Sequence, residues 1–325
     1  MMRLAVRALL GSAATIALSA PTYGALATAA IAAPTDTTTA AMASARPPGP
    51  QTRADLATAM RGEAFANVSY RLYAEQARRE GLSSVADLFE RAANIELNEH
   101  FTKAADLSGT VGDNAANLRS AISGEAYEAV TMYPRFAQQA RSAGDDNAAD
   151  RFSEIAHDEA SHRDAFRTAL GVVQTGRGTV PTAPQVHPVQ VPAGTPKVGS
   201  EQTKTNLDTA MHGEATAYAK YTLWGKHANK EGNADVGRLF TRNADVERQE
   251  HFAEEADLAG LVGTTHQNLT KAIAGERYES TTMYPRFAER AKAAGDTEAA
   301  RFFTHNASDE AGHAKDFQQA KDAMR

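Results

Sequence analysis

The chain of 325 residues contains a long internal repeat, and this repeat constrains the fold more than any other feature. Residues 51–166 align with residues 202–317 without a gap, at an offset of 151 and with roughly half of the positions identical. A fold that suits this sequence must therefore be built twice from one unit. We expect two such units, a first repeat at residues 51–170 and a second repeat at residues 201–325.

The apolar residues of each repeat are spaced for helices. They recur at intervals of three and four over long runs, glycine ends each run, and strand-like alternation is absent. The pattern predicts an all-α fold made of tandem four-helix bundles. In the first repeat the four helices are expected at residues 53–80, 83–108, 115–143 and 146–170, with copies 151 residues later.

The segments outside the repeats have the composition of a targeting sequence and of linkers. Residues 1–33 combine Arg3 and Arg7, an apolar run and small residues, which predicts a cleavable signal peptide and a secreted or extracytoplasmic protein. The apolar run is interrupted before the roughly 20 residues that a membrane span requires, so a retained anchor is the weaker alternative. Residues 34–50 and 171–200 are proline-rich, which predicts a disordered linker before the first repeat and a second linker between the repeats.

The composition excludes several kinds of chemistry. The chain contains no cysteine, so it cannot form disulfides, thiolate metal sites or a cysteine nucleophile. The 34 Lys and Arg residues against 40 Asp and Glu residues give a formal net charge of -6 without a basic block, so a nucleic-acid partner is not expected. Oxygen and nitrogen ligands for a cation remain.

Carboxylates occupy the apolar faces of all four predicted helices. Glu63 lies in the middle of the apolar stripe of the first helix, where an ionised carboxylate is costly unless it is paired or binds a metal. The second and third helices each place two carboxylates on this face, and the fourth places a glutamate and a histidine there. The full set is Glu63, Glu96, Glu99, Glu125, Glu128, Glu159 and His162, repeated as Glu214, Glu247, Glu250, Glu276, Glu279, Glu310 and His313.

Any one of these glutamates could be an ordinary surface residue, because glutamate is usually solvated. The set indicates otherwise, since all seven side chains recur at one offset while expected surface positions such as Glu154 and His305 differ between the copies. Oxygen ligands with one imidazole, supplied by four facing helices, are typical of the di-iron and di-manganese sites of ferritin-like bundles. We therefore expect two iron ions per site, with manganese or zinc as alternatives.

The sequence resembles the rubrerythrin family over both repeats. The resemblance rests on residues 60–64, 124–128, 132–134 and 159–162, each with its copy in the second repeat. It implies that Glu63 and Glu125 are terminal ligands, that Glu96 and Glu159 bridge two metals, that His162 binds one metal and that Glu128 is an additional carboxylate. It also implies that four tyrosines orient the ligands, although they could equally be core aromatics; these are Tyr70, Tyr133, Tyr221 and Tyr284.

Two features depart from the family pattern. Members usually carry Glu-x-x-His on the second helix, whereas here Glu96 is followed by Glu99 at that spacing and by His100 one position later. We favour Glu99, and Glu250 in the second repeat, as ligands; the alternative is a one-residue bulge that turns His100 and His251 inward. The family's rubredoxin-like domain needs four cysteines and is missing, so an external electron donor is expected.

The loop between the second and third helices is too short for a closed repeat. A ferritin-like site requires these helices to be parallel, so the chain must return over about 33 Å, the length of about 22 helical residues. Residues 108–114 reach only about 24 Å when fully extended. We predict that the first two helices of one repeat pair with the last two of the other. The alternative is that the third helix frays at its start and each repeat closes on itself.

Three functions are compatible with such sites. The resemblance implies a peroxidase that reduces hydrogen peroxide with electrons from an external donor. A ferroxidase or iron-binding role that uses oxygen or peroxide is the alternative, favoured by a further oxygen ligand at Glu99, because hard ligands stabilise ferric iron. A helical protein that binds zinc or manganese without redox turnover is the third. Assembly into a homo-oligomer stays open in each case.

Overall fold

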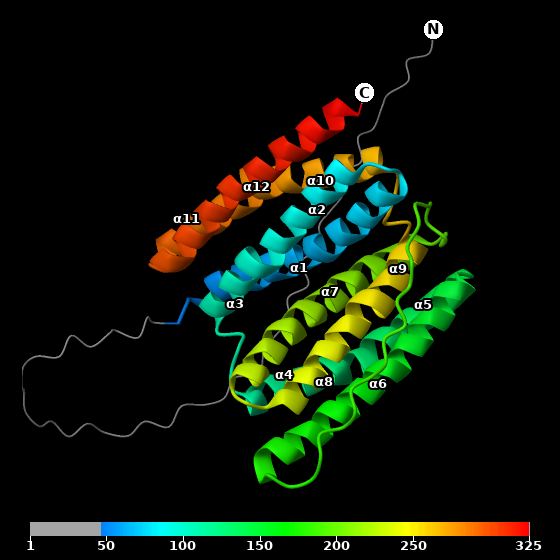
Figure 1. The fold of residues 1–325 in the computed structure, drawn as a ribbon, viewed down its shortest axis with the longest axis vertical. Coiled ribbons are helices and arrows are strands. Elements are labelled where there is room, and N and C mark those ends of the chain that lie inside the picture. The colour runs from blue at the N-terminus through cyan, green and yellow to red at the C-terminus, as the bar shows by residue number, and fades with distance from the viewer. Residues whose placement is uncertain (1–46, 325) are drawn as a thin grey trace, which may run out of the picture. The chain divides into compact units, whose positions relative to one another are not determined.

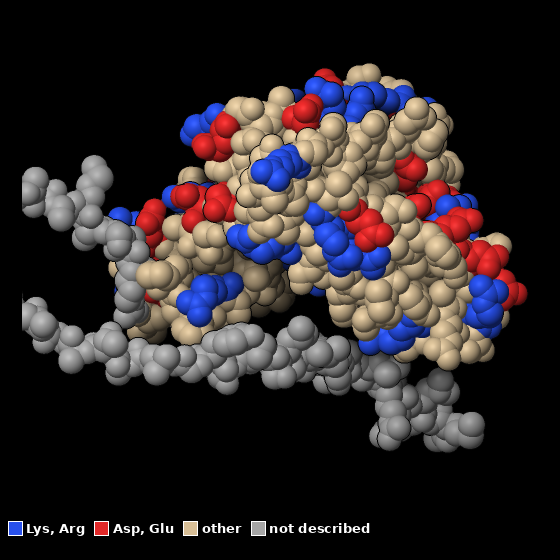
Figure 2. Space-filling model, turned by 90° about the horizontal axis from the view of Figure 1, so that it is seen from below, with Lys and Arg blue, Asp and Glu red and all other residues tan. Residues whose placement is uncertain are grey.

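The computed structural model of the chain describes residues 47–324. The expected signal peptide at 1–33 and all but the end of the 34–50 segment lie outside the described residues. Within residues 47–324 the fold is all-α, without strands. None of the helices described has the length and apolar character to cross a membrane. Acidic and basic side chains lie side by side on the face drawn in Figure 2, rather than in a block of one sign.

The first repeat forms four helical rods, and two of these run through a π-helical turn. The first rod is α1 (Pro50–Arg79) and the fourth is α6 (Asp146–Thr175). The second consists of α2 (Ser83–Ile95), the π turn η1 (Glu96–Phe101) and α3 (Thr102–Ser108). The third consists of α4 (Asn114–Tyr127), the π turn η2 (Glu128–Met132) and α5 (Tyr133–Ala143).

The second repeat forms the same four rods. The first rod is α7 (Glu201–Lys230) and the fourth is α12 (Thr297–Ala323). The second consists of α8 (Ala234–Val246), the π turn η3 (Glu247–His251) and α9 (Phe252–Ala259). The third consists of α10 (Thr265–Tyr278), the π turn η4 (Glu279–Met283) and α11 (Tyr284–Ala294).

One helix end differs from the prediction. Gly171 was expected to end the fourth rod, but α6 continues to Thr175. The helix ends at Gly176, which has φ +65° and so takes the left-handed conformation that closes a helix. Gly171 keeps helical geometry, because glycine permits a left-handed turn without imposing one.

Each four-helix bundle contains two rods from each repeat (Figure 1). The rods α1 and α2–α3 pack with α10–α11 and α12 in one bundle, and α7 and α8–α9 pack with α4–α5 and α6 in the other. The predicted exchange of helix pairs is confirmed. Its cause is the short connection from α3 to α4, which cannot bring the chain back along the rod it has just left. The helices α1 and α7 pack on each other and join the two bundles.

Aromatic side chains from both repeats fill the bundle cores. Phe317 of α12 lies 5.0 Å from Phe89 of α2 and 5.4 Å from Tyr70 of α1, between ring centroids. In the other bundle, Phe166 of α6 packs on Phe240 and Tyr221 at 5.1 and 5.3 Å. Each buried phenylalanine contributes roughly 1.5–3 kcal/mol by leaving water. The cores therefore stabilise the exchanged pairing rather than closed repeats.

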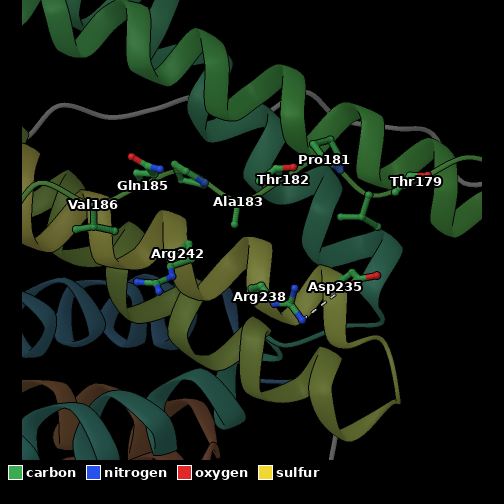
Figure 3. Close-up of a pocket in the computed structure, with 11 residues that line it drawn as sticks. Thr179, Pro181, Thr182, Ala183, Gln185, Val186, Asp235, Arg238 and Arg242 are labelled. Carbon is green, nitrogen blue, oxygen red and sulfur yellow. Dashed lines mark ion pairs between the residues drawn. The ribbon is translucent and has the colours of Figure 1, made fainter.

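The segment between the repeats is extended and packs on the second repeat. After α6 ends, residues 177–200, which we call the strap, run beside α8 and α9 without regular structure. The backbone amides of Val189, Gly194 and Lys197 donate hydrogen bonds of 2.9 Å to Gln249, Val262 and Leu258. A cavity of about 610 Å³ lies between strap residues 179–186 and α8, and its lining includes the arginines of α8 that Figure 3 labels. The strap is thus fixed along much of its length.

Candidate metal centres

The exchange brings carboxylates and imidazoles of both repeats into two buried clusters. We call the first centre A. It joins three residues of the first repeat to three of the second: Glu63, Glu96, His100, Glu276, Glu310 and His313. Its ligand atoms form two overlapping groups, each within 4.8 Å, and Glu96 and Glu310 belong to both groups. Such an arrangement has room for two neighbouring cations that share two carboxylates.

Centre B repeats this geometry in the other bundle. It consists of Glu125, Glu159, His162, Glu214, Glu247 and His251. Its two groups share Glu159 and Glu247, one from each repeat. Four groups of ligand atoms therefore occur in two pairs among the described residues, and each pair suits two metal ions.

The shared carboxylates lie between two imidazoles. In centre A, the Glu96 carboxylate is 2.9 Å from His100 Nδ1 and 3.1 Å from His313 Nδ1. Glu310 is 3.0 Å from His313 Nδ1 and 3.1 Å from His100 Nδ1. Such a carboxylate can offer one oxygen to each of two metals while an imidazole completes the ligand set of each. By this geometry Glu96 and Glu310 would bridge, and Glu63 and Glu276 would be terminal.

The preference for Glu99 and Glu250 over the following histidines is wrong. Glu99 is exposed, and Glu250 is half-buried and accepts a hydrogen bond of 2.7 Å from the His187 amide of the strap. His100 and His251 are buried and face the clusters. The cause is the π turn, which adds a residue to the helical turn, so the side chain four positions after Glu96 takes the place expected for the third.

Two aspartates that the sequence analysis missed hold these histidines. Asp309 lies 3.3 Å from His100 Nε2, and Asp158 lies 3.5 Å from His251 Nε2. A carboxylate on the outer ring nitrogen fixes the tautomer and orientation of a ligand histidine. Both aspartates directly precede a shared glutamate, Glu310 or Glu159, and this position was the only signal in the sequence.

Each terminal glutamate accepts a hydrogen bond from a tyrosine of the other repeat. Tyr70 donates to Glu276 and Tyr284 donates to Glu63 in centre A. Tyr133 donates to Glu214 and Tyr221 donates to Glu125 in centre B. The four tyrosines of the sequence analysis thus contact the clusters, which favours an orienting role over a role in packing alone.

Glu128 and Glu279 lie beside the clusters and outside the four groups of ligand atoms. Both are half-buried, at the first residues of η2 and η4. Burial raises the pKa of Glu128 to about 8, and the charges of Glu159 and Glu247 add to this rise. Burial and the charge of Glu310 likewise raise the pKa of Glu279. These positions suit the additional carboxylate of the third helix that the resemblance implied.

Without cations, the clusters retain protons. Burial raises the pKa of Glu63, and the neighbouring Glu310 adds to this. Burial opposes ionisation of Glu96 as well, but the adjacent imidazoles of His100 and His313 outweigh it and lower the pKa of Glu96 to about 2. Burial lowers the pKa of His162, yet the surrounding carboxylates raise it to about 10. Metal ions would replace these protons, because metal ligands bind in their deprotonated forms.

Buried oxygens without hydrogen-bond partners fit bound cations. Glu96 Oε1 and Glu310 Oε1 in centre A, and Glu125 Oε2 and Glu159 Oε1 in centre B, are buried and accept no hydrogen bond. A buried polar atom in this state is costly, and a metal ion would satisfy it. The donor set of oxygens and imidazole nitrogens suits iron, manganese or zinc.

Centre B has one further buried carboxyl that centre A lacks. Glu255 is fully buried, and its Oε1 lies 2.9 Å from the hydroxyl of Tyr133, which also donates to Glu214. The corresponding residue of the first repeat is Ala104. A tyrosine has one proton to donate, so both contacts are satisfied only when one of the two carboxyls, Glu214 or Glu255, is itself protonated. Burial raises the pKa of Glu255, in agreement with this.

The fold and the two clusters define a four-helix-bundle carboxylate protein with paired metal positions. A sequence model of the rubrerythrin family matches residues 94–170 and 242–321, one segment in each repeat. The chain belongs to the rubrerythrin family, whose members bind two iron ions in such sites.

Individual relatives match over the length of about one repeat. Rubrerythrin of Nitratidesulfovibrio vulgaris is 38% identical over 128 residues, which are 36% of this chain and 67% of the relative. Rubrerythrin-2 of Clostridium acetobutylicum is 33% identical over 141 residues, 39% of this chain and 77% of the relative. Nigerythrin of Nitratidesulfovibrio vulgaris is 33% identical and matches over 64% of its own length. No solved structure matches the chain at a significant level.

Proposed function

We propose that this chain is an exported rubrerythrin-like protein that reduces hydrogen peroxide to water at two di-iron centres, as a defence against oxidative stress. The observation that carries the proposal is the sharing of Glu96 and Glu310 by two ligand groups in centre A, and of Glu159 and Glu247 in centre B. Two metal ions held this closely can deliver two electrons to one substrate. Reduction of one hydrogen peroxide consumes two electrons and two protons and gives two waters.

Iron bound in these centres supplies the electrons and acts as a Lewis acid. The protein's own residues hold and orient the ligand set. Tyr70 and Tyr284 donate hydrogen bonds to the terminal glutamates of centre A and keep one oxygen of each directed toward the tyrosine. Asp309 holds the ring of His100 so that Nδ1 faces the cluster. The ligand positions are therefore set before substrate arrives.

Burial of the centres excludes bulk water and keeps protons close to the site. Glu63, Glu96, Glu276 and Glu310 are almost fully buried. Carboxyls whose pKa is raised by burial, such as Glu279 beside centre A, can hold a proton and release it to a product oxygen. In centre B, Glu128 lies in the corresponding position, with its pKa raised to about 8 by burial and neighbouring carboxylates.

The partners follow from the chemistry. These 325 residues include no cysteine, so the chain carries no cysteine-ligated iron that could supply the electrons. We propose a separate electron donor that meets the protein outside the cytoplasm. The proposed export rests on residues 1–33, and cleavage of that segment from the exported protein would test it.

The ferroxidase alternative loses the feature that favoured it. The further oxygen ligand was Glu99, whose side chain is exposed, and an imidazole takes its place in the cluster. Ferroxidase chemistry and static binding of zinc or manganese are therefore outcomes of the test and not second proposals.

Stopped-flow absorbance tests the proposal. The mature chain is loaded anaerobically with Fe(II) and mixed with hydrogen peroxide or with oxygen. We expect oxidation by peroxide to be much faster than oxidation by oxygen, with iron retained and available for a second reduction. Oxidation by oxygen at an equal or greater rate, followed by release of Fe(III), would assign a ferroxidase. Failure to bind Fe(II) would refute both activities.

A further inference from the structure

A cavity of about 290 Å³ lies where α1, α4 and α7 meet, outside the ligand groups of centre B. Arg61 of α1 lines it on one side, Lys220 and Trp224 of α7 line it on another, and Glu128 reaches it from η2. Gly213 lies next to Glu128 in the lining, and a Cβ atom there would be 3.5 Å from Glu128 Oε1, an ordinary van der Waals contact. The cavity thus adjoins centre B without being part of it.

Among residues 47–324, neither of the two cations of this cavity forms an ion pair with a carboxylate. Lys220 is half-buried, and no hydrogen bond or ion pair within the described residues engages its ammonium group. Arg61 donates to the backbone oxygen of Thr209 at 3.2 Å and forms no ion pair with a described carboxylate. A partly buried cation without a partner is unfavourable, and an anion from solution would compensate it.

The one carboxylate in the lining offsets this charge only in part. Glu128 forms no hydrogen bond or ion pair with Lys220 within residues 47–324, and it is one acidic side chain against the two basic side chains Arg61 and Lys220. By formal charge the lining of the cavity is therefore positive.

We propose that this cavity binds a small oxyanion, of the size and charge of inorganic phosphate, between Lys220 and Arg61. The ammonium and the guanidinium would each donate charge-assisted hydrogen bonds to it. Room for one tetrahedral oxyanion is available in a cavity of about 290 Å³. The anion would lie next to Glu128 and so modulate centre B and not centre A.

The corresponding place beside centre A has different residues. Ser69 stands where the second repeat has Lys220, and Phe65 stands where it has Thr216. The ring of Phe65 stacks on His212 with centroids 4.0 Å apart and planes within 6°, so it takes up the space that the shorter threonine leaves. The repeat itself therefore supplies matched substitutions, in which one copy is changed to the residue of the other.

The only tryptophan of the chain reports on this cavity. Trp224 lines it and is 2% exposed. Sodium phosphate is titrated into the full chain, metal-free and zinc-loaded, at constant ionic strength with chloride as the reference anion. We expect a saturable change in tryptophan fluorescence and, by calorimetry, one phosphate per chain. Lys220→Ser should weaken binding about tenfold or more, because one charge-assisted hydrogen-bond partner is lost.

The controls distinguish specific phosphate binding in this cavity from general effects of charge. Ser69→Lys should leave the phosphate affinity measured from Trp224 fluorescence unchanged. Arg61→Gln, at an exposed position, should weaken phosphate binding as Lys220→Ser does. It serves as the test if Lys220→Ser does not fold. The proposal is overturned by the absence of saturation, by an equal response to chloride, or by unchanged affinity in Lys220→Ser. The experiment uses neither peroxide nor iron, so such a result would leave the proposed function intact.

Discussion

Tyr70 of the first repeat donates its hydroxyl hydrogen bond to Glu276 of the second, a residue 206 positions further along the chain. Tyr284 makes the reciprocal bond to Glu63. The two contacts cross between repeats in opposite directions, so centre A has no complete set of oriented ligands within either repeat. Centre B has the same property through Tyr133 and Tyr221.

A single repeat should therefore not fold as a closed monomer. We expect residues 51–170, expressed alone, to self-associate in pairs, because two copies can supply the helix pairs that the full chain exchanges internally. Light scattering coupled to size-exclusion chromatography measures this, with the full chain as the reference. A folded monomer of the isolated repeat that binds two iron ions would contradict the exchange.

The π turn should decide which residue of the second helix binds metal. His100→Ala removes an imidazole of centre A, so the iron content should fall from about four to about two per chain. Glu99→Ala is the matched control, because Glu99 is one residue away and exposed, and it should retain all the iron. Elemental analysis of both variants after anaerobic loading measures this. Loss of iron in Glu99→Ala with full iron content in His100→Ala would instead support Glu99 as the ligand, as the sequence analysis favoured.

Asp309 should act on metal affinity through His100. Asp309→Ala removes the carboxylate 3.3 Å from His100 Nε2, and loss of such an outer partner typically costs about 10–100-fold in affinity. Asp309→Asn keeps a hydrogen-bond acceptor and should recover most of the affinity. Competition with a chelator measures the effect, and equal affinity of Asp309→Ala and the unmodified chain would exclude this role.

Glu255 should make the metal-free chain less stable as the pH rises. Burial raises the pKa of Glu255, so its folded form keeps a proton that the unfolded chain releases. Its contribution is present below the ordinary glutamate pKa and is lost as the pH rises through the raised value, with a slope of about 1.4 kcal/mol per pH unit for one proton. Glu255→Ala, which introduces the residue of the first repeat, should flatten this decline.

Urea unfolding of the metal-free chain at several values between about pH 5 and pH 8 measures the difference. Ala104→Glu in the first repeat is the complementary variant and should steepen the decline. Parallel stability curves for the unmodified chain and Glu255→Ala would show that the carboxyl is ionised in the fold.

Much of this architecture could be predicted from the sequence because it depends on length and periodicity. The short connection after Ser108 argued against a closed repeat, and recurrence of the inward carboxylates at one offset indicated a metal site in each copy. Both inferences use distances along the chain. The rods begin and end within a few residues of the expected positions, apart from the extension of α6 to Thr175.

The residues that were missed depend on contacts distant in sequence. With the period of an α-helix, Glu99 would follow Glu96 on the same face, whereas η1 is wound more widely. The inward position of His100 is stabilised by Glu310 and Asp309 of the second repeat, which local periodicity cannot show. Glu255 occurs in only one copy, so recurrence at the offset of 151 residues could not indicate it.

Iron stoichiometry of paired variants tests most directly whether each centre takes its bridging carboxylates from both repeats. Glu96 and Glu310 lie in centre A, whereas Glu159 lies in centre B. The account predicts that the double variant Glu96→Ala/Glu310→Ala retains about two iron ions per chain, because one intact centre remains, and that Glu96→Ala/Glu159→Ala retains none. Retention of about two ions by the second variant and loss of all iron by the first would contradict it, since each repeat would then hold its own centre.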